Sequence, residues 1–198
     1  MGREGITVLE FDEAKHEYRW CGEVVPSVTQ ILKPLSDFSR IPPDVLERKR
    51  QIGTATHKAI ELHLTGGVEL ESIDPAVLPY FNAFLRFEEE NQFRMEQCET
   101  RVHHHLYRYA GTLDLIGPVK SGPLALIDLK TAAEFSPAWG PQTAAYYQAT
   151  APFAATMDRA ALQLRDDGTY RYHRLTRAGD FATFLACLNI YNFQREFK

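Results

Sequence analysis

Apolar and polar residues recur with regular spacing along most of the chain, and this spacing predicts an ordered series of strands and helices. At the start, Ile6–Phe11, Glu17–Trp20 and Glu23–Val25 are short runs separated by turn residues, a pattern typical of a β-meander. Ser27 directly precedes the next apolar run, so a short helix capped by the serine hydroxyl is expected over residues 28–32.

Two longer helical patterns follow. Pro42-Pro43-Asp44 is typical of a helix start and Gly66-Gly67 of a helix end, so a long helix is predicted between them. Asp74-Pro75 begins a second helix, whose apolar residues recur at helical spacing. These apolar residues are Val77, Leu78, Phe81 and Leu85.

The second half of the chain alternates strands with helices. The expected elements are strands over about 93–102, 109–117 and 124–130, a helix from Pro141 to about 155, a hairpin over 160–174 that turns at Asp166-Asp167-Gly168, and a helix over about 178–196. This order predicts an α/β fold with a central mixed sheet flanked by helices, preceded by the N-terminal β-meander.

Length and composition favour one domain. The chain has 198 residues, 44% of them hydrophobic, which is enough to bury one good core. We therefore expect a single domain over residues 1–198. Within it, 1–40 would form the meander and short helix, 41–175 the main core and 176–198 the C-terminal helix.

The net charge and the cysteines limit the partners and the cellular compartment that the sequence predicts. The net charge is −4 and the pI is near 6.0, so no overall positive field attracts nucleic acid, although a local site can differ from the average. Cys21, Cys98 and Cys187 form no CxxC pair, which indicates a reducing compartment and argues against an iron–sulfur cluster or structural zinc. Because there is no apolar leader and no run of membrane-spanning length, a cytoplasmic protein without membrane contact is expected.

Acidic residues inside two predicted strands give the first indication of chemistry. Asp114 and Asp128 each lie in an apolar run, and Lys130 stands two residues after Asp128. Because strand side chains alternate between faces, Asp128 and Lys130 point to the same side, and Asp114 on the adjacent strand can meet them at one end of the sheet. Buried carboxylates are costly without a partner, and a hard divalent cation, Mg2+ or Mn2+, would offset that cost. A simple ion pair between Lys130 and one aspartate is the alternative.

Two helices supply further candidates. His57 follows Gly53 by one helical turn, which leaves space beside the imidazole for a metal or a substrate backbone, and Glu61 one turn later is placed to orient the ring. Gln142 and Tyr146 share one face of the helix after the lysine-bearing strand, where an amide and a phenol can bond phosphate oxygens or the lysine. Each of these features taken alone also occurs in ordinary helices.

Together these residues meet the requirements of metal-assisted phosphodiester cleavage. A cation held by Asp114, Asp128 and His57 would polarise the scissile phosphate and lower the pKa of a bound water, and Lys130 would supply positive charge beside the developing oxyanion. Basic residues around His57 then become candidate DNA contacts, with a solvated helix face as an equal alternative. This basic cluster consists of Arg40, Arg48, Lys49, Arg50 and Lys58.

The ordered set Gly53…His57, Gly111-Thr-Leu-Asp114, Asp128-Leu-Lys130 and Gln142…Tyr146 resembles the motifs of RecB-type nucleases in the PD-(D/E)XK superfamily. The resemblance covers about residues 50–150 by motif and nearly the whole chain by element order. The opening segment, residues 16–32, is similar to the start of small phage-encoded members. The chain departs from the pattern in having leucine at 113 where the superfamily's name has proline, and in lacking the cysteine cluster of relatives that hold an iron–sulfur centre.

This resemblance implies the restriction-endonuclease-like PD-(D/E)XK core and a Mg2+- or Mn2+-dependent deoxyribonuclease. An exonuclease acting on linear DNA ends is favoured, with a role in phage DNA processing, recombination or repair in the bacterial host cytoplasm. The residues that the resemblance assigns are His57, Asp114, Asp128 and the Leu129 carbonyl as metal ligands, Lys130 as the catalytic lysine, Gln142 and Tyr146 as its supporting pair, and Glu99 as a further acidic position. Arg48, Arg50 and Lys58 are the expected DNA contacts.

Several alternatives stay open. A non-catalytic nucleic-acid-binding or interaction module on the same fold, and a structure-specific endonuclease, are the competing functions. The sequence does not decide the number of metal ions, the strand preference, or whether the protein acts as a monomer, dimer or ring. His103-His104-His105 favours a polar loop over a metal site, because neighbouring strand residues face alternately.

Overall fold

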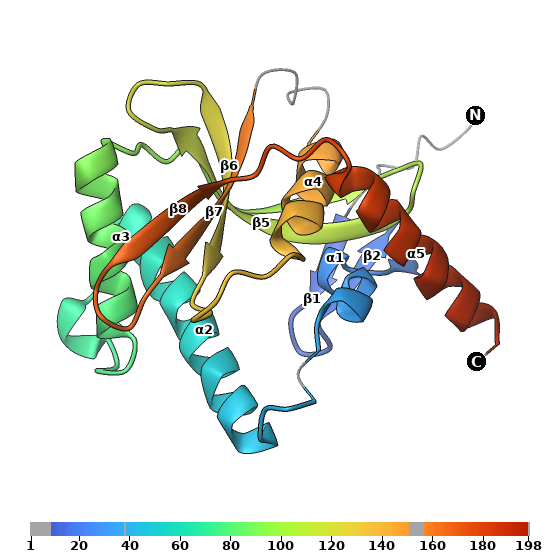
Figure 1. Cartoon of the computed structure of the whole chain (residues 1–198), viewed down its shortest axis with the longest axis horizontal. Coiled ribbons are helices and arrows are strands. Elements are labelled where there is room, and N and C mark those ends of the chain that lie inside the picture. The colour runs from blue at the N-terminus through green and yellow to red at the C-terminus, as the bar shows by residue number, and fades with distance from the viewer. Residues whose placement is uncertain (1–8, 38, 151–156, 198) are drawn as a thin grey trace, which may run out of the picture.

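The computed structural model describes residues 9–37, 39–150 and 157–197 and shows an α/β protein with two sheets (Figure 1). The N-terminal sheet is antiparallel and contains β1 (Leu9–Asp12), β2 (Glu17–Trp20) and β3 (Glu23–Val25). The larger sheet contains β4 (Gln97–His104), β5 (Tyr109–Pro118), β6 (Leu124–Lys130), β7 (Asp158–Leu164) and β8 (Tyr170–Arg174). The helices are α1 (Val28–Ile31), α2 (Pro43–Leu64), α3 (Leu78–Asn91), α4 (Trp139–Ala149) and α5 (Asp180–Glu196), with short 3-10 turns η1 (Lys33–Leu35) and η2 (Leu70–Ser72).

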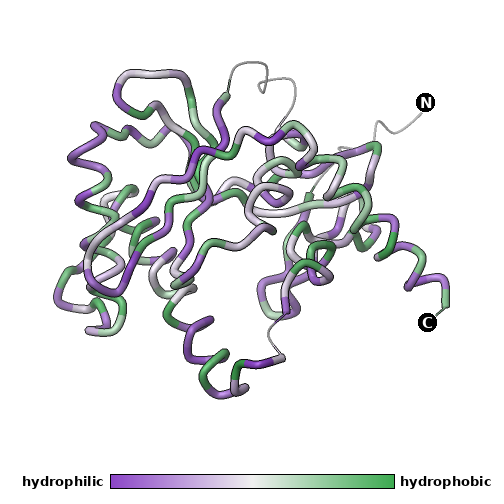
Figure 2. The backbone as a smooth tube through the Cα atoms, in the orientation of Figure 1, coloured by the Kyte–Doolittle hydropathy of each residue, from purple (hydrophilic) through white to green (hydrophobic). Residues whose placement is uncertain are grey.

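The larger sheet is mixed, with its strands in the order β4-β5-β6-β7-β8. Neighbouring strands are antiparallel except β6 and β7, which run parallel. A parallel pair needs a crossover connection, and α4 supplies it between β6 and β7. The central strands have helices over both faces, and most of their residues are apolar. Figure 2 shows how hydrophobic and hydrophilic segments are distributed along the backbone.

Two apolar clusters fill the opposite faces of this sheet. One packs α2 and α3 against Leu115, Ile127 and Leu162, and includes three fully buried phenylalanines of α3. The other packs α1, α4 and α5 against Tyr109 and Leu126. Figure 1 shows the same division, with α2 and α3 at one end of the molecule and α4 and α5 at the other. Burial of this apolar surface is the main stabilising contribution to the fold.

The N-terminal sheet is tied to β5 through the start of α1. The Ser27 hydroxyl accepts a hydrogen bond from the Gln30 amide at 3.1 Å, and the Gln30 side chain accepts one from the Ser27 amide at 3.0 Å. This reciprocal pair is a capping box, which fixes the first turn of α1. The Ala110 amide of β5 donates to the Pro26 carbonyl at 3.0 Å, so the segment before α1 pairs with the edge of β5.

β5 and β6 separate in the middle of the sheet. Their paired residues run from Pro118↔Leu124 to Leu115↔Ile127, and the next residues along are Asp114 and Asp128. Beyond this point β5 continues with β4 on one side, and β6 continues with β7. Both aspartates thus stand where two neighbouring strands diverge, a place where side chains can enter between them.

Most of the expected elements are confirmed, including the α/β class, the mixed sheet, the meander, the Ser27 cap and the final hairpin. The strand expected from residue 93 begins at Gln97, and the helix expected from Asp74 begins at Leu78. The end predicted for the helix after Pro141 falls in 151–156, outside the described residues. Among the described helices, none is both long and apolar enough to cross a membrane.

Gly117 gives a direct test of this packing. A Cβ at this position would lie 2.0 Å from the Arg94 carbonyl oxygen and 2.8 Å from the Phe93 ring, so Gly117→Ala should lower the free energy of unfolding by about 1–3 kcal/mol. Gly67→Ala is the matched control, because its Cβ would meet only Leu62 at 3.5 Å or more. Urea denaturation of both variants measures the difference. Equal midpoints would show that the chain before β4 does not pack on β5 as described.

Candidate active site

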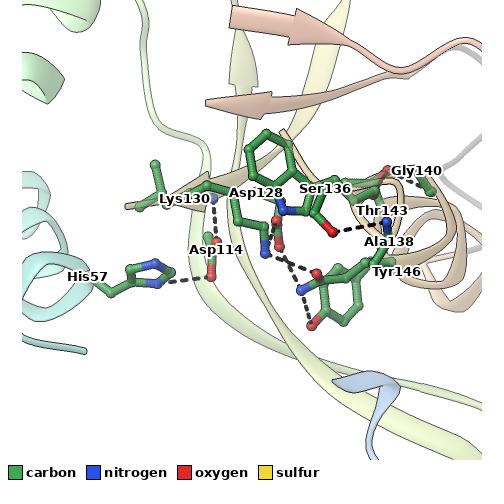
Figure 3. A network of polar contacts seen from close by, with 12 residues as sticks. His57, Asp114, Asp128, Lys130, Ser136, Ala138, Gly140, Thr143 and Tyr146 are labelled. Carbon is green, nitrogen blue, oxygen red and sulfur yellow. Dashed lines mark hydrogen bonds and ion pairs between the residues drawn. The ribbon is translucent and has the colours of Figure 1, made fainter. Parts of the chain in front are cut away.

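Seven polar side chains from five elements converge where β5 and β6 separate. Figure 3 labels His57, Asp114, Asp128, Lys130 and Tyr146 among them. They are His57 from α2, Glu99 from β4, Asp114 from β5, Asp128 and Lys130 from β6, and Gln142 and Tyr146 from α4. Figure 3 shows His57 reaching toward Asp114 from one side, while Lys130 and Asp128 face Tyr146 on the other. The grouping joins residues up to 89 positions apart, from 57 to 146, and therefore depends on the whole fold.

Asp114 connects the backbone to the candidate metal ligands. The residue is 8% exposed, and one carboxylate oxygen accepts a hydrogen bond from the Leu129 amide at 2.6 Å. The other oxygen lies 3.3 Å from Nδ1 of His57. Since β5 no longer pairs with β6 here, the carboxylate takes the place of a backbone acceptor for the Leu129 amide. A buried acid at this position therefore completes the sheet as well as the site.

Asp128, Lys130 and Gln142 form a closed set of contacts. The Lys130 ammonium lies 2.5 Å from Oδ2 of Asp128 and donates to Oε1 of Gln142 at 2.9 Å. The Gln142 amide nitrogen donates to Oδ1 of Asp128 at 3.0 Å and contacts the Tyr146 hydroxyl at 3.4 Å. With its oxygen toward the ammonium and its nitrogen toward the carboxylate, the amide of Gln142 has one satisfactory orientation. This set holds the lysine side chain, which is 18% exposed, in one place.

Burial makes Asp128 an unusual carboxylate. Desolvation raises its pKa to about 6, although the nearby Lys130 ammonium favours the charged form. Its buried Oδ2 atom has the Lys130 ammonium as its partner, at 2.5 Å. Both carboxylate oxygens of Asp128 are therefore engaged, Oδ2 by Lys130 and Oδ1 by Gln142.

His57, Glu99 and Asp114 form the group best suited to hold a metal ion. One ligand atom from each lies within 4.8 Å of the other two. An imidazole nitrogen and two carboxylate oxygens suit divalent cations that accept nitrogen and oxygen ligands, but they do not single out one metal. Glu99 has φ of +47°, a left-handed conformation that is strained for a residue with a side chain and that is found at functional positions.

The pKa values in this group show the strength of its internal electrostatics. Burial opposes the charged form of His57, but Asp114 outweighs it and raises the pKa of His57 to about 9. Burial, reinforced by the Asp114 charge, raises the pKa of Glu99 to about 7. Two carboxylates at this separation repel each other, and a divalent cation between them would remove that repulsion.

The structure brings some of the predicted site residues together and places others apart. Asp128 and Lys130 share a face, and Asp114 meets His57, as expected. Asp128 is not a member of the three-residue metal group, in which Glu99 takes its place. The prediction that Glu61 orients His57 is wrong, because the Glu61 carboxylate accepts a hydrogen bond from Lys58 at 2.8 Å.

The surroundings of Gly53, of the predicted DNA contacts and of Leu129 differ from those expected or leave the predicted role open. The space beside Gly53 faces the Thr131 hydroxyl, which a Cβ at that position would approach to 3.2 Å, and not the imidazole. Of the proposed DNA contacts, Lys58 pairs with Glu61, and Arg50 lies 3.7 Å from Glu47. Arg48 lines a surface pocket of about 490 Å3 together with Lys49 and Tyr80. The Leu129 amide is engaged with Asp114, and a role for its carbonyl stays a prediction.

Of the three consecutive histidines, His103 and His104 face different partners, as the strand alternation predicts, and His105 stacks on His104 with ring centroids 5.8 Å apart. His103 packs on Trp20, with ring centroids 5.1 Å apart, and His104 packs on Tyr109 at 5.3 Å. Burial lowers the pKa of both, which keeps them neutral near pH 7. Neither belongs to the metal group found in the described residues.

Gln163 is a structural contributor that the sequence pattern does not reveal. It lies beside Lys130 on the neighbouring strand β7 and is 2% exposed. Its amide nitrogen donates to the carbonyls of Ala132 and Ala133 at 2.8 and 2.9 Å, and its oxygen lies 3.0 Å from Nε2 of His173. Gln163 therefore fixes the loop between Lys130 and α4. An isolated glutamine in an apolar strand gives no signal of this role.

Gly111 also has a specific reason to be glycine. A Cβ at this position would lie 2.6 Å from the Tyr146 ring, so only glycine allows the ring to rest on β5. The Tyr146 hydroxyl is thereby placed next to Gln142.

Comparison of the chain with models of known protein families, and with curated protein sequences, gives no match.

Metal binding can be measured without any substrate. Wild-type protein should bind Mn2+ in isothermal titration calorimetry, and Asp114→Asn should weaken that binding at least about tenfold, since a charged ligand is lost. Glu61→Gln is the matched control, because it removes a carboxylate that faces Lys58 on the same helix as His57. Binding by Asp114→Asn at the wild-type affinity would exclude this group as the metal site.

Glu99 makes the stability of the metal-free protein depend on pH. Its pKa of about 7 in the folded state is above its ordinary value of 4.5, so the folded state holds this proton more tightly and loses stability as pH rises from 4.5 through 7. Glu99→Gln removes this loss. In EDTA the variant should be more stable than wild type by about 1–3 kcal/mol above pH 7, with the difference vanishing below about pH 4.5. Urea denaturation at both ends of this range provides the measurement, and a difference independent of pH would contradict the assignment.

Proposed function

We propose that this protein is a metal-dependent deoxyribonuclease that hydrolyses phosphodiester bonds at the ends of linear DNA. The observation that carries the proposal is the convergence of Asp114, Asp128, Lys130 and His57 at the place where two sheet strands separate. The mixed sheet with its flanking helices is consistent with the PD-(D/E)XK core, and the ordered motifs resemble those of RecB-type nucleases. The proposed setting is DNA processing, recombination or repair in a bacterial cytoplasm.

The donor set fits the proposed Mg2+ or Mn2+. His57, Glu99 and Asp114 would hold the cation, and Asp128 would join them as a further ligand if its Oδ2 atom exchanged the Lys130 ammonium for the metal. When bound, such a cation would polarise the scissile phosphate and lower the pKa of a coordinated water. The imidazole must lose its proton to act as a ligand, so His57 would release a proton as the metal binds.

Lys130 would supply the positive charge that stabilises the reacting phosphate. Its ammonium is held by Asp128 and Gln142, so little rearrangement is needed when the substrate arrives. Gln142 accepts a hydrogen bond from the Lys130 ammonium and donates one to the Asp128 carboxylate, so it holds both groups in place. The Tyr146 hydroxyl, on the same helix, accepts a hydrogen bond from Gln142. A structural ion pair would need neither the amide of Gln142 nor the strained backbone of Glu99, and this favours catalysis over a retired site.

Lys130→Ala provides the direct test of this role. End-labelled linear DNA incubated with Mg2+ should be degraded by wild type, and the variant should be slower by about 100-fold or more, because one preorganised charge at the reacting phosphate is lost. EDTA should abolish the wild-type activity. Lys120→Ala, which removes an exposed lysine from the turn between β5 and β6, should retain full activity. Degradation by Lys130→Ala at the wild-type rate would refute the catalytic assignment.

Comparison of two DNA forms separates the end-directed enzyme from an endonuclease. An exonuclease degrades linear duplex and spares covalently closed circles of the same sequence. Cleavage of the circle at a comparable rate would identify the structure-specific endonuclease instead. Binding of DNA without any turnover would identify the non-catalytic module.

A further inference from the structure

Arginine and aromatic side chains form a stacked surface beside the candidate metal group. The Arg101 guanidinium lies 5.3 Å from the centre of the Phe11 ring, and the Arg108 guanidinium lies 5.4 Å from the centre of the Trp20 ring. Trp20 also packs on His103 at 5.1 Å. We call these five residues the stacking surface. Both arginines are exposed, and the three rings are partly exposed.

The stacking surface is continuous with the proposed active site. Glu99, Arg101 and His103 occupy alternate positions of β4, so Arg101 follows the Glu99 metal ligand by about 7 Å along the strand. In the register of the sheet, Arg101 is paired with Thr112 of β5, two residues from Asp114. A nucleotide strand that leads along β4 to the metal group would therefore meet His103 first, then Arg101, and Glu99 last.

The N-terminal sheet is held rigidly in this position. The Tyr18 hydroxyl and the Thr112 hydroxyl are 2.7 Å apart, and the Ala110 amide donates to the Pro26 carbonyl at 3.0 Å. Tyr18 is buried and packs on Phe11, with ring centroids 4.4 Å apart. The rings of the stacking surface are thus fixed relative to the catalytic residues before any ligand arrives, which lowers the entropic cost of binding.

The charge of the surface contrasts with that of the chain. The whole chain carries −4, whereas Arg101 forms no ion pair with the described residues and Arg108 pairs with Glu23 alone. Flat aromatic rings combined with guanidinium groups are the chemistry that binds unpaired nucleotides, through base stacking and phosphate contacts. A duplex keeps its bases stacked on each other, so it offers these rings no free base face.

We propose that the stacking surface binds a single-stranded segment of the nucleic-acid substrate next to the bond that is cleaved. Phe11 and Arg101 bind the nucleotide nearest to Glu99, and Trp20 with Arg108 binds a neighbouring one. The inference rests on the proposed nuclease function for its position and adds the substrate class: the end that enters the site is unpaired.

Binding of a labelled oligothymidine, followed by fluorescence anisotropy, tests this proposal. The measurements use the Lys130→Ala background in Mg2+, so that the probe is not consumed. Arg101→Ala and Phe11→Leu should each raise the Kd for the oligothymidine by at least about fivefold, since one base stack is lost. The same changes should alter the Kd for a blunt duplex, whose bases are paired throughout, by less than about twofold.

Arg195→Ala is the matched control, because Arg195 lies 5.9 Å over the Tyr191 ring on α5, away from the site. Its affinity for the oligothymidine should equal that of the parent. No binding by the parent, or equal affinities for Arg101→Ala and Arg195→Ala, would overturn the stacking surface. Intact, variant-sensitive binding combined with no DNA cleavage by the wild type would instead overturn the nuclease assignment and leave the surface in place.

Discussion

The hydrogen bond from the Leu129 amide to the Asp114 carboxylate is the interaction that joins the fold to the site. A buried strand amide requires an acceptor, and here the acceptor is a side chain because β5 has moved away from β6. One carboxylate oxygen is fixed by this bond, which leaves the other at 3.3 Å from His57. The sheet therefore fixes the orientation of the Asp114 carboxylate at its own centre.

On the β6 side of the place where β5 and β6 separate, Gln142 holds the charged pair Asp128 and Lys130. Asp128 and Lys130 lie on one strand face, and an ammonium beside a buried carboxylate would form a simple pair if nothing else were present. The amide of Gln142 contacts both partners through different atoms, so the charge of the lysine is shared instead of being fully neutralised by Asp128. Gly111 of β5 contributes to the same arrangement, because the absence of its Cβ lets the Tyr146 ring pack on β5 with its hydroxyl beside Gln142.

The sequence predicted the elements and the central residues well, because each of these depends on local periodicity or on adjacent strands. Alternation placed Asp128 and Lys130 on one face, and the Ser27 cap followed from local hydrogen bonding. The prediction for Glu61 failed since helical spacing permits contact with either neighbour one turn away, and Lys58 offers an opposite charge. The roles of Glu99 and Gln163 depend on a left-handed backbone conformation and on a contact with a distant loop, neither of which a strand pattern encodes.

The separation of β5 from β6 has a second consequence. The half of β5 that loses β6 needs another partner for its edge, and the Pro26 carbonyl provides one by accepting from Ala110. This contact brings the N-terminal sheet against β4 and the turn that follows it, where Phe11 meets Arg101 and Trp20 meets Arg108. Thus the separation of β5 from β6 makes room for the acidic side chains. It also leaves the edge of β5 free to pair with the segment that carries the aromatic rings of the proposed substrate surface. Glu99 of the candidate metal group and Arg101 of the stacking surface then keep a constant spacing, because both lie on β4.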